Sequence, residues 1–363
     1  MKKLFIVLIL CIFFITSFYI SANANDNTYD YFKDELKYTE DIVPDEYKSE
    51  IKEYSLDLDA IINGDFDINN LFALIKDKIF SQLDVVTNIT VSMLLILIIS
   101  VISEILINNE STGYIILLFS CILIISDLTA AVKETANALQ SSSIFMSALI
   151  PVYAGMIISS GYAATGTGYS TIMFIFSQII TFLSNYLLLP VCSCLLALSI
   201  SSSLIKEKLK NIVLFITKSI TVIITVVLGA FISILSLQTV ISKTSDSIGL
   251  KTAKYFTGSF VPVVGSFVSE SLSIVITSMG LLKSSIGVFS IICLIVIFLP
   301  TLIKNTILKI EISIFCYIFE SFNVNTISAF LKGINNVMSI IIGIEASSIV
   351  IFIISSALTM SVS

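Results

Sequence analysis

The sequence predicts an all-α protein: a polytopic membrane helical bundle with a small N-terminal extracytoplasmic helical region. Of the 363 residues, 56% are hydrophobic and only 13% are charged, and the mean hydropathy is +1.00. A soluble domain has about 45–50% apolar and about 25% charged residues, so this chain carries more apolar surface than a fold in water can bury. Several apolar runs also reach the roughly 17–25 residues that a helix needs to cross a bilayer.

The acidic residues are concentrated near the N-terminus. Residues 25–80 hold 15 Asp and Glu against 6 Lys, whereas residues 81–363 hold 11 acidic residues against 12 Lys. The formal net charge of −6 therefore belongs to a short water-facing region, and the remainder is nearly neutral. We predict a signal peptide over 1–24, an acidic extracytoplasmic helical region over 25–80, and a polytopic transmembrane domain over 81–363.

The first 24 residues have the features of a secretory signal peptide. Lys2 and Lys3 precede an apolar run over 4–20, and the pattern Ala22-Asn23-Ala24 follows the run. A positive start, an apolar centre and an A-x-A site occur in this order in cleaved signals. The alternative is an uncleaved first membrane span. In both cases the region that follows is expected to face outward, because lysine-rich loops are the ones usually retained in the cytoplasm.

Two helices are predicted to begin within the acidic region. The first starts at Pro44, which acidic residues follow in the first turn, and ends at Gly64. The second extends from about Ile68 to Ile107 and carries an apolar residue every three or four positions, with no stop signal on the way. We expect this second segment to be one long helix that enters the membrane.

The remaining apolar runs predict about six to eight membrane segments. The five clear runs are 85–107, 113–131, 211–237, 286–303 and 337–360, and a weaker run covers 144–160. The short run 306–319, which lysines and Glu320 flank, either lies in the plane of the interface or joins the bundle. Residues 171–203 are too long for one untilted span and contain Pro190, so they form either one kinked helix or a hairpin of two short helices. Residues 260–282 combine Pro, Gly, Ser and Glu, which predicts a broken helix that is buried in protein or faces a cavity.

The orientation of the segments depends on one basic cluster. Lys206, Lys208 and Lys210 are expected on the cytoplasmic side of the membrane. If the N-terminal region faces outward, an odd number of crossings must lie between residues 81 and 205. Three spans followed by a hairpin over 171–203 meet this condition, whereas three spans followed by one straight span do not.

The residue inventory predicts no enzymatic activity. The chain has no His, no Arg and no Trp, so it lacks the commonest general base and metal ligand and the bidentate guanidinium group. The cysteines, including the pair Cys192 and Cys194, lie in apolar runs and are interpreted as small buried hydrophobes. The Gly166–Gly168 stretch is too short for a nucleotide motif and is interpreted as a flexible connector. We therefore expect no catalytic residue, no metal, no cofactor and no nucleic-acid partner.

Ionisable residues inside apolar runs are the main functional candidates, because they are costly to place in a membrane. They are Glu104, Asp127, Lys218, Glu270 and Glu345. The first three lie close enough to the ends of their runs to reach the lipid headgroups. The last two lie deeper, and we expect them either to line a pore or inter-helix contact or to be paired within the bundle, for instance with a Lys. A candidate packing or pore seam comprises Pro151, Pro262, Gly265, Ser269, Glu270, Ser271 and Glu345.

Two blocks of the sequence resemble one known family. The block Phe260-Val261-Pro262-Val263-Val264-Gly265, with Ser269-Glu270-Ser271-Leu272, Leu281-Leu282-Lys283 and Gly287 after it, resembles the signature region of stage III sporulation protein AE. The block from Phe145 to Val152, with Gly161 after it, is similar to the other recognisable block of that family. The order of signal peptide, short soluble region, long helix and polytopic bundle also matches.

The resemblance implies a role in late forespore development. Proteins of this family are the polytopic members of a complex, often described as a channel or feeding tube, that also includes a secretion-type ATPase and ring-forming membrane proteins. It therefore implies a multi-pass subunit of the sporulation channel or secretion-like complex linking mother cell and forespore. We expect it in the mother-cell membrane around the forespore, in contact with the lipid bilayer and the complex's other membrane proteins. The alternative is a stand-alone secondary transporter, in which the stretches around Pro151 and Pro262 would be paired broken helices.

Overall fold

The computed structural model describes residues 33–63, 65–106, 110–204, 210–260 and 265–361. Every regular element within these residues is a helix and none is a strand, which confirms the all-α prediction. Three short helices come first: α3 (Lys33–Asp41), α4 (Asp45–Glu53) and α5 (Leu58–Asn63). The long elements that follow are α6 (Ile68–Leu106), α7 (Glu110–Ser159), α8 (Ala163–Phe182), η1 (Leu183–Leu188), α9 (Leu189–Leu204), α10 (Lys210–Phe260), α11 (Gly265–Ser321) and α12 (Asn325–Ser361).

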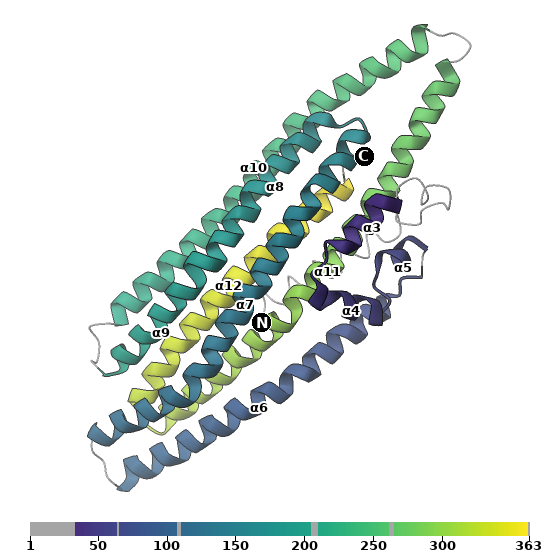
Figure 1. Ribbon diagram of the computed structural model, residues 1–363. Helices are drawn as coiled ribbons and strands as arrows, with labels where there is room; N and C mark the ends of the chain where they lie inside the picture. Colours follow the sequence, from purple (N-terminus) through teal and green to yellow (C-terminus); the bar gives the residue numbers. More distant parts are fainter. Residues whose placement is uncertain (1–32, 64, 107–109, 205–209, 261–264, 362–363) are drawn as a thin grey trace.

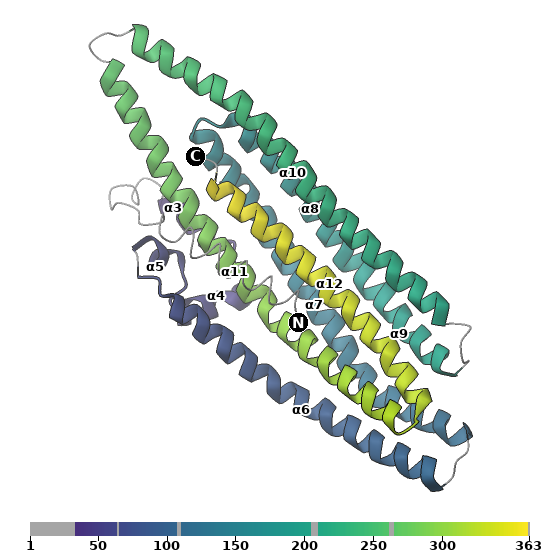
Figure 2. The same cartoon turned by 180° about the vertical axis from the view of Figure 1, so that it is seen from behind.

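The long helices lie side by side as antiparallel rods in an elongated bundle (Figures 1 and 2). We call the end where α6, α9 and α11 finish and α7, α10 and α12 begin the lower end, as drawn in Figure 1. The opposite, upper end holds the turn from α7 to α8, the end of α10 and the start of α11. The short helices α3, α4 and α5 lie beside α11, away from the lower end (Figures 1 and 2).

The long helices exceed the thickness of a bilayer. α7 has 50 residues and α11 has 57, which at 1.5 Å per residue makes them about 75 and about 85 Å long. The hydrocarbon core of a bilayer is only about 30 Å thick. Candidate membrane-spanning helices among the described residues are Thr112–Ser159, Ala163–Ser203, Asn211–Gln238, Ser284–Ser321 and Asn325–Met360, with a shorter apolar stretch at Ile89–Ser103. Each long helix can therefore lie only partly inside the membrane.

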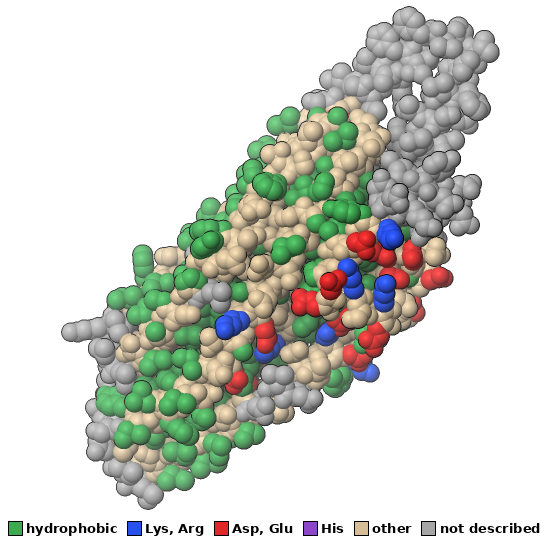
Figure 3. All heavy atoms as spheres, in the orientation of Figure 1, with side chains coloured by type: hydrophobic (Ala, Val, Ile, Leu, Met, Phe, Trp, Pro, Cys, Tyr) green, Lys and Arg blue, Asp and Glu red, His purple; other side chains and the backbone are tan. Residues whose placement is uncertain are grey.

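Exposed side chains show which part of the bundle faces lipid. Near the lower end, α6 and α7 expose large apolar side chains, among them Leu94, Leu95, Ile98, Ile115, Leu118 and Ile122. Further along α7 comes a group of exposed polar side chains, at Lys133, Glu134, Asn137 and Gln140, before apolar side chains are exposed again at Ile144 and Ile158. We infer from this polar group, which lies on the side of α7 next to the acidic region, that a membrane boundary crosses α7 near Lys133. In Figure 3, apolar side chains are spread along the whole described length of this face, whereas most charged side chains gather over α3–α5.

The acidic region lies beyond that boundary. Glu46 of α4 accepts a hydrogen bond of 3.4 Å from the hydroxyl of Ser141, which is above Lys133 on α7. Tyr54 donates a 2.7 Å hydrogen bond to Asp77, and Lys78 pairs with Glu50 at 2.5 Å, so the region is also attached to the start of α6. A water-facing position for these charges agrees with the charge pattern of the sequence.

Two pairs of apolar runs that the sequence analysis treated as separate segments form single helices. The runs 113–131 and 144–160 both lie in α7, and the runs 286–303 and 306–319 both lie in α11. The polar residues between the runs do not turn the chain, because they bind one another across the bundle. Lys304 forms an ion pair of 2.7 Å with Glu134, for example. The prediction of separate segments was therefore wrong for 113–131 and 144–160, whereas 306–319 joins the bundle, which is one of the two possibilities left open for it.

Residues 171–203 form no hairpin. α8, η1 and α9 follow one another as one rod, with the π-helical turn η1 just before Pro190. A π turn is widened, so it can absorb the missing N–H and the ring of a proline without ending the helix. The hydroxyl of Ser184 in η1 donates a 2.9 Å hydrogen bond to the carbonyl of Ala136, which holds the turn against α7.

The charge rule requires an odd number of membrane crossings between residues 81 and 205, and the structure meets this condition without the predicted hairpin over 171–203. Between residues 81 and 205 lie the rods α6, α7 and α8–η1–α9, because 113–160 is one helix. Lys206 and Lys208 lie outside the described residues, but α9 ends and α10 begins at the lower end on either side of them. A cytoplasmic basic cluster then puts the lower end on the cytoplasmic side and α3–α5 on the outward side.

The acidic region differs in one detail from its prediction. Pro44 is the N-cap residue of α4, as expected, but the helix ends at Glu53 instead of continuing to Gly64. Ser55 adopts a φ of 51°, and the N–H of Leu56 bonds to the carbonyl of Ile51 at 2.9 Å. This break turns the chain so that Leu56 is buried. The second predicted helix, in contrast, is confirmed as α6, Ile68–Leu106.

The glycine pair at 166 and 168 belongs to α8 and forms no flexible connector. Only Ser160, Gly161 and Tyr162 separate α7 from α8, and Gly161 has a φ of 91°, which favours glycine. A Cβ atom at Gly168 would lie 1.5 Å from the side-chain nitrogen of Gln238 in α10. The glycine therefore leaves room for the side chain of Gln238 between α8 and α10.

The first turn of α8 is capped by a residue from another helix. Asp246 of α10 accepts hydrogen bonds from the N–H groups of Ala164 and Thr165, both at 2.9 Å, and from the Thr165 hydroxyl at 2.6 Å. These N–H groups have no partner within their own helix, and an acceptor with negative charge suits a helix N-terminus. Asp246 thus supplies the cap that residue Tyr162 does not supply.

We expect Asp246→Ala to lower the free energy of unfolding by about 1–3 kcal/mol, because two buried N–H groups and a hydroxyl lose their acceptor. Asp246→Asn keeps one acceptor oxygen and should cost less. The measurement is equilibrium unfolding in mixed detergent micelles, with amide hydrogen exchange reporting on the first turn of α8. Equal losses for the two variants, or unchanged exchange at Thr165, would contradict the capping role.

Candidate functional site

Much of the predicted seam falls where the structure gives no side-chain information. Pro262 lies outside the described residues. Gly265, Ser269, Glu270 and Ser271 lie in the first turns of α11, and their side chains are likewise outside what the structure describes. The predicted role of these five residues as a packing or pore seam therefore stays a prediction.

The two described members of the seam lie apart. Pro151 is exposed and sits inside α7, which continues through it without a break. Glu345 of α12 is fully buried, at 0% exposure. Glu345 lies at the same level of the bundle as Thr135 of α7, because both bind the side chain of Asn305. Pro151 lies 16 residues after Thr135, which is about 24 Å along the axis of α7. The structure thus does not join Pro151 and Glu345 in one site.

Glu345 is the centre of a buried polar cluster formed by Thr135, Thr301, Asn305 and Glu345. Its carboxylate accepts hydrogen bonds from the hydroxyl of Thr301 and, at 3.2 Å, from the side-chain amide of Asn305. The same amide of Asn305 donates to the hydroxyl of Thr135 at 2.7 Å. The cluster therefore joins α7, α11 and α12 at one level of the bundle.

An ion pair lies beside this cluster. The ammonium of Lys304 is 2.7 Å from both carboxylate oxygens of Glu134. Lys304 and Glu134 each precede a cluster residue in the chain, so the ion pair and the Asn305–Thr135 bond form neighbouring contacts between α7 and α11. Lys304 binds Glu134, and Glu345 takes its hydrogen bonds from neutral donors. A further contact of α11 runs to α6, where the hydroxyl of Thr90 donates to Glu311.

Hydroxyl groups extend these contacts toward the upper end. Tyr153 donates to Ser290 at 2.7 Å, which links α7 to α11, and Tyr169 bonds to Ser355 at 2.7 Å, which links α8 to α12. Between α7 and α8, the hydroxyl of Ser177 lies 2.6 Å from that of Ser147. Polar side chains that bond across helices in an apolar bundle hold the helices in register. These hydrogen bonds therefore fix the helices relative to one another.

Sequence reasoning identified Glu345 but missed its partners. Thr135, Thr301 and Asn305 are uncharged polar residues in or next to apolar runs, and the sequence analysis did not single them out. Their spacing along the chain carries no sign that they meet, since Asn305 and Thr135 are 170 residues apart. The one local signal is that Thr301, Lys304 and Asn305 recur at helical spacing within an apolar helix.

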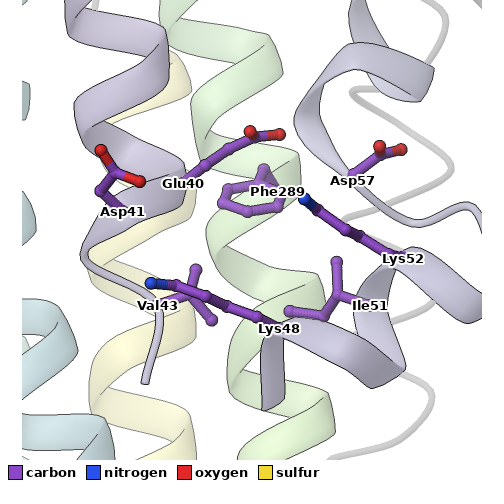
Figure 4. Close-up of a pocket in the computed structure, with 8 residues that line it drawn as sticks. All are labelled: Glu40, Asp41, Val43, Lys48, Ile51, Lys52, Asp57 and Phe289. Atoms are coloured by element: carbon purple, nitrogen blue, oxygen red, sulfur yellow. The ribbon is translucent and has the colours of Figure 1, made fainter. Parts of the chain in front are cut away.

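A small pocket forms where the acidic region meets α11. It has a volume of about 70 Å³ and is lined by Glu40, Asp41, Val43, Lys48, Ile51, Lys52, Asp57 and Phe289. Figure 4 shows the ring of Phe289 among charged side chains that come from the N-terminal helices and the segment after them. A water molecule occupies about 30 Å³ in the liquid, so the pocket has room for solvent or an ion only.

Three carboxylates, two of which line this pocket, have the spacing of metal ligands. Oxygens of Glu40, Asp57 and Asp59 all lie within 4.8 Å of one another, the one such group among the described residues. Carboxylate oxygens suit Ca²⁺ and Mg²⁺. However, Glu40 also accepts a 3.2 Å hydrogen bond from the N–H of Leu58, and two lysines line the same pocket. The group is explained as a structural contact between α3 and α5, and we assign it no metal.

Glu40 predicts a pH effect on the acidic region. Partial burial, and then the nearby Asp59 carboxylate, raise the pKa of Glu40 above its ordinary value. A carboxyl group with a raised pKa favours folding when protonated, so its stabilising contribution is complete at acid pH and is lost as the pH rises through the raised pKa. We expect hydrogen exchange in α3 and α5 to accelerate as the pH rises from about 4 to about 7, after correction for the intrinsic rate.

Glu40→Gln should remove most of this pH dependence. Asp45→Asn is the matched control, because the hydrogen bond from Lys48 lowers the pKa of Asp45, which gives the opposite pH trend. If Glu40→Gln left the pH profile of α3 and α5 unchanged, Glu40 would not be its source.

Comparisons with known proteins agree with the resemblance of the two sequence blocks. The family model described as stage III sporulation protein AE matches residues 51–363, which include all the long helices α6 to α12. Among curated proteins, stage III sporulation protein AE of Bacillus subtilis (strain 168) is 27% identical over 177 residues. This alignment spans 48% of the present chain and 44% of that relative, so it covers less than half of either protein. No solved structure matches the chain.

Proposed function

The chain belongs to the stage III sporulation protein AE family, and on this premise we propose that it is a membrane subunit of the sporulation channel or secretion-like complex that links mother cell and forespore. The family supports a role in sporulation, and the long apolar helices support a membrane protein. The finer assignment to the mother-cell membrane around the forespore, and to a role in late forespore development, is part of the proposal.

The observation that carries the proposal is the exposed polar group of α7 around Asn137 and Gln140, from which we infer that the bundle extends beyond the membrane. α7 continues for about 26 residues after Lys133, which is about 40 Å of helix on the outward side. In the inferred orientation this side is the space between the mother-cell membrane and the forespore membrane. A rigid outward projection with an exposed polar side, at Asn137 and Gln140, suits contact with the other membrane proteins of the complex.

The internal contacts support a structural role over an enzymatic one. The buried carboxylate of Glu345 and the hydroxyls of Tyr153, Tyr169 and Ser177 are each bonded to a neighbouring helix. These groups hold the bundle together, and none of them faces a described cavity as a catalytic residue must. We therefore propose a subunit without enzymatic activity that presents binding surfaces.

A photo-reactive amino acid at position 137 or 140 tests this proposal in sporulating cells. We expect crosslinked products with other membrane proteins of the stage III complex. The control is position 118, where Leu118 is exposed in the lipid-facing part of α7 and should give mainly lipid adducts. If positions 137 and 140 also react only with lipid, the outward projection does not exist and the proposal fails.

The transporter alternative has lost one of the two broken helices on which its sequence argument rested. It required a pair of broken helices around Pro151 and Pro262, and α7 is continuous through Pro151. Purified protein in liposomes tests it directly, because a transporter would move solutes without a partner. Solute flux by the chain alone, together with no crosslinks to complex members, would replace our proposal with the transporter.

A further inference from the structure

Glu345 is a buried acidic residue without a counter-ion. Its side chain is at 0% exposure, and the partners of its carboxyl group are the hydroxyl of Thr301 and the side-chain amide of Asn305, both uncharged. The nearby ammonium of Lys304 is occupied by the two carboxylate oxygens of Glu134. An ionised carboxylate that is buried without a cation is costly, and such a group usually takes up a proton instead.

Among the described residues, no other charged group compensates Glu345. The helices that pack against α12 are α7, α9, α10 and α11. Their described charged and titratable side chains on either side of Glu345 are Asp127, Lys133 and Glu134 on α7, Cys192 and Cys194 on α9, Lys218 on α10, and Cys293, Lys304, Lys309 and Glu311 on α11. Lys133 and Lys218 are exposed, and Glu311 takes a hydrogen bond from Thr90 of α6. The carboxyl group of Glu345 is bonded to none of these side chains.

The polar cluster around Glu345 has four contacts of hydrogen-bond length. The hydroxyl oxygen of Thr301 contacts one carboxyl oxygen of Glu345 and lies 3.0 Å from the carbonyl oxygen of Phe298. The side-chain nitrogen of Asn305 lies 3.2 Å from the other carboxyl oxygen of Glu345 and 2.7 Å from the hydroxyl of Thr135. Each contact needs a hydrogen between its two atoms. The Asn305 amide supplies two hydrogens and the Thr301 hydroxyl supplies one, so one contact lacks a hydrogen.

A proton on Glu345 supplies the missing hydrogen. The carbonyl of Phe298 and an ionised carboxylate are both acceptors, so the single hydrogen of Thr301 can serve only one of them fully. If Glu345 is protonated, its own O–H donates to the oxygen of Thr301, and the hydroxyl of Thr301 donates to the carbonyl of Phe298. All four contacts are then hydrogen bonds, and the cluster carries no net charge.

We propose that Glu345, with Thr301 and Asn305, forms a proton-binding site that is occupied at neutral pH. The proton comes from water and bonds to the carboxyl oxygen next to Thr301, and no other covalent bond forms or breaks. The occupied site ties α12 to α11 and, through Asn305 and Thr135, to α7. Loss of the proton leaves a buried negative charge and one contact without a hydrogen, so the three helices are then held less firmly.

A proton suits this site better than a metal ion does. Ca²⁺ and Mg²⁺ take about six or more oxygen ligands. Here the side-chain amide of Asn305 presents its hydrogens to both Glu345 and Thr135, so a nitrogen donor stands where a further oxygen ligand would be needed.

Infrared spectroscopy of the purified full-length protein in detergent micelles tests the site, because a protonated carboxyl group absorbs apart from ionised carboxylates and amides. At neutral pH we expect the unchanged protein to show a protonated carboxyl band that Glu345→Gln lacks. Glu320→Gln is the matched control, because the carboxylate of Glu320 has Lys332 as its counter-ion, and this variant should keep the band. Circular dichroism confirms that each variant is folded.

The position of the band tests the contact with Thr301. Thr301→Val removes the acceptor of the carboxyl O–H, so the band should move to higher wavenumber, whereas Thr301→Ser keeps the hydroxyl and should leave the band in place. These two variants retain Glu345, so they test the site even if Glu345→Gln does not fold.

The pH dependence of stability gives an independent measurement. An unfolded chain releases the glutamate proton near pH 4.3, whereas the folded protein retains it, so stability falls as the pH rises. For one proton, the equilibrium constant of unfolding rises about tenfold per pH unit. From about pH 5 to about pH 7 it should therefore rise about a hundredfold more in the unchanged protein than in Glu345→Gln.

Four outcomes would overturn the proposal. They are identical carboxyl bands in the unchanged protein and Glu345→Gln, an unmoved band in Thr301→Val, and the same pH dependence of unfolding with and without Glu345. The fourth is loss of the band when sodium replaces choline at constant ionic strength and pH, which would make a metal cation the ligand. The measurements use the purified chain alone, so their result does not depend on the proposed sporulation complex.

Discussion

Replacing Asn305 by leucine should lower the free energy of unfolding by about 2–3 kcal/mol. The side-chain amide of Asn305 is the donor to both Glu345 and Thr135, and all three side chains are buried. Leucine has a similar volume but no donor, so the Glu345 carboxylate loses one of its two hydrogen bonds without gaining water. An unsatisfied buried polar group costs about 1–3 kcal/mol, and more when it is charged.

The double variant Asn305→Leu with Glu345→Leu should recover most of the lost stability. Exchanging both members of a buried polar pair for apolar residues is often neutral, whereas removing one member is costly. Equilibrium unfolding by a denaturing detergent, followed by circular dichroism, measures both variants. The surface control is Asn137→Leu, because Asn137 is exposed and should change stability by less than about 0.5 kcal/mol. A double variant no more stable than Asn305→Leu alone would show that the two residues are not coupled.

Gly333→Ala should destabilise the bundle by about 1–3 kcal/mol through overpacking. A Cβ atom at Gly333 would lie 2.4 Å from the hydroxyl oxygen of Ser199, 2.5 Å from its Cβ and 3.3 Å from its Cα. Two of these atoms belong to the rigid part of α9, so a rotamer change cannot relieve the contact and α12 must move away. Thermal unfolding in detergent should show the loss as a lower midpoint.

Two variants make the prediction for Gly333 specific. Gly343→Ala on the same helix should be neutral or stabilising by up to about 1 kcal/mol, because no atom lies within 4 Å of its added Cβ. Ser199→Gly should partly rescue Gly333→Ala, because it removes both of the closest atoms. A Gly333→Ala protein as stable as Gly343→Ala, or no rescue by Ser199→Gly, would argue against a close crossing of α9 and α12.

The candidate site could be predicted only in part. Glu345 was found because an acidic residue deep in an apolar run is costly, and this cost is visible in the sequence alone. Its partners Thr301 and Asn305 were not found, because nothing local distinguishes a polar residue that faces another helix from one that faces headgroups. Asp246 was missed for the same reason, since it caps a helix that begins about 80 residues earlier in the chain.

By itself the sequence determined the all-α class, the membrane character, the family blocks, the N-cap at Pro44 and the single helix Ile68–Leu106. These features follow from composition and from contacts between residues three or four positions apart, which any helix makes wherever it packs. Only the tertiary structure decided that α7 and α11 are each continuous, because their polar residues are held by partners about 170 residues away.

The tertiary structure also decided which of two similar patterns is a close crossing. Ala329-x-x-x-Gly333 and Ser339-x-x-x-Gly343 both have small residues four positions apart, the spacing that permits helices to approach. Only Gly333 meets a neighbouring helix. The spacing shows that a helix has a side narrow enough for contact, but which side faces a partner depends on how the whole bundle packs.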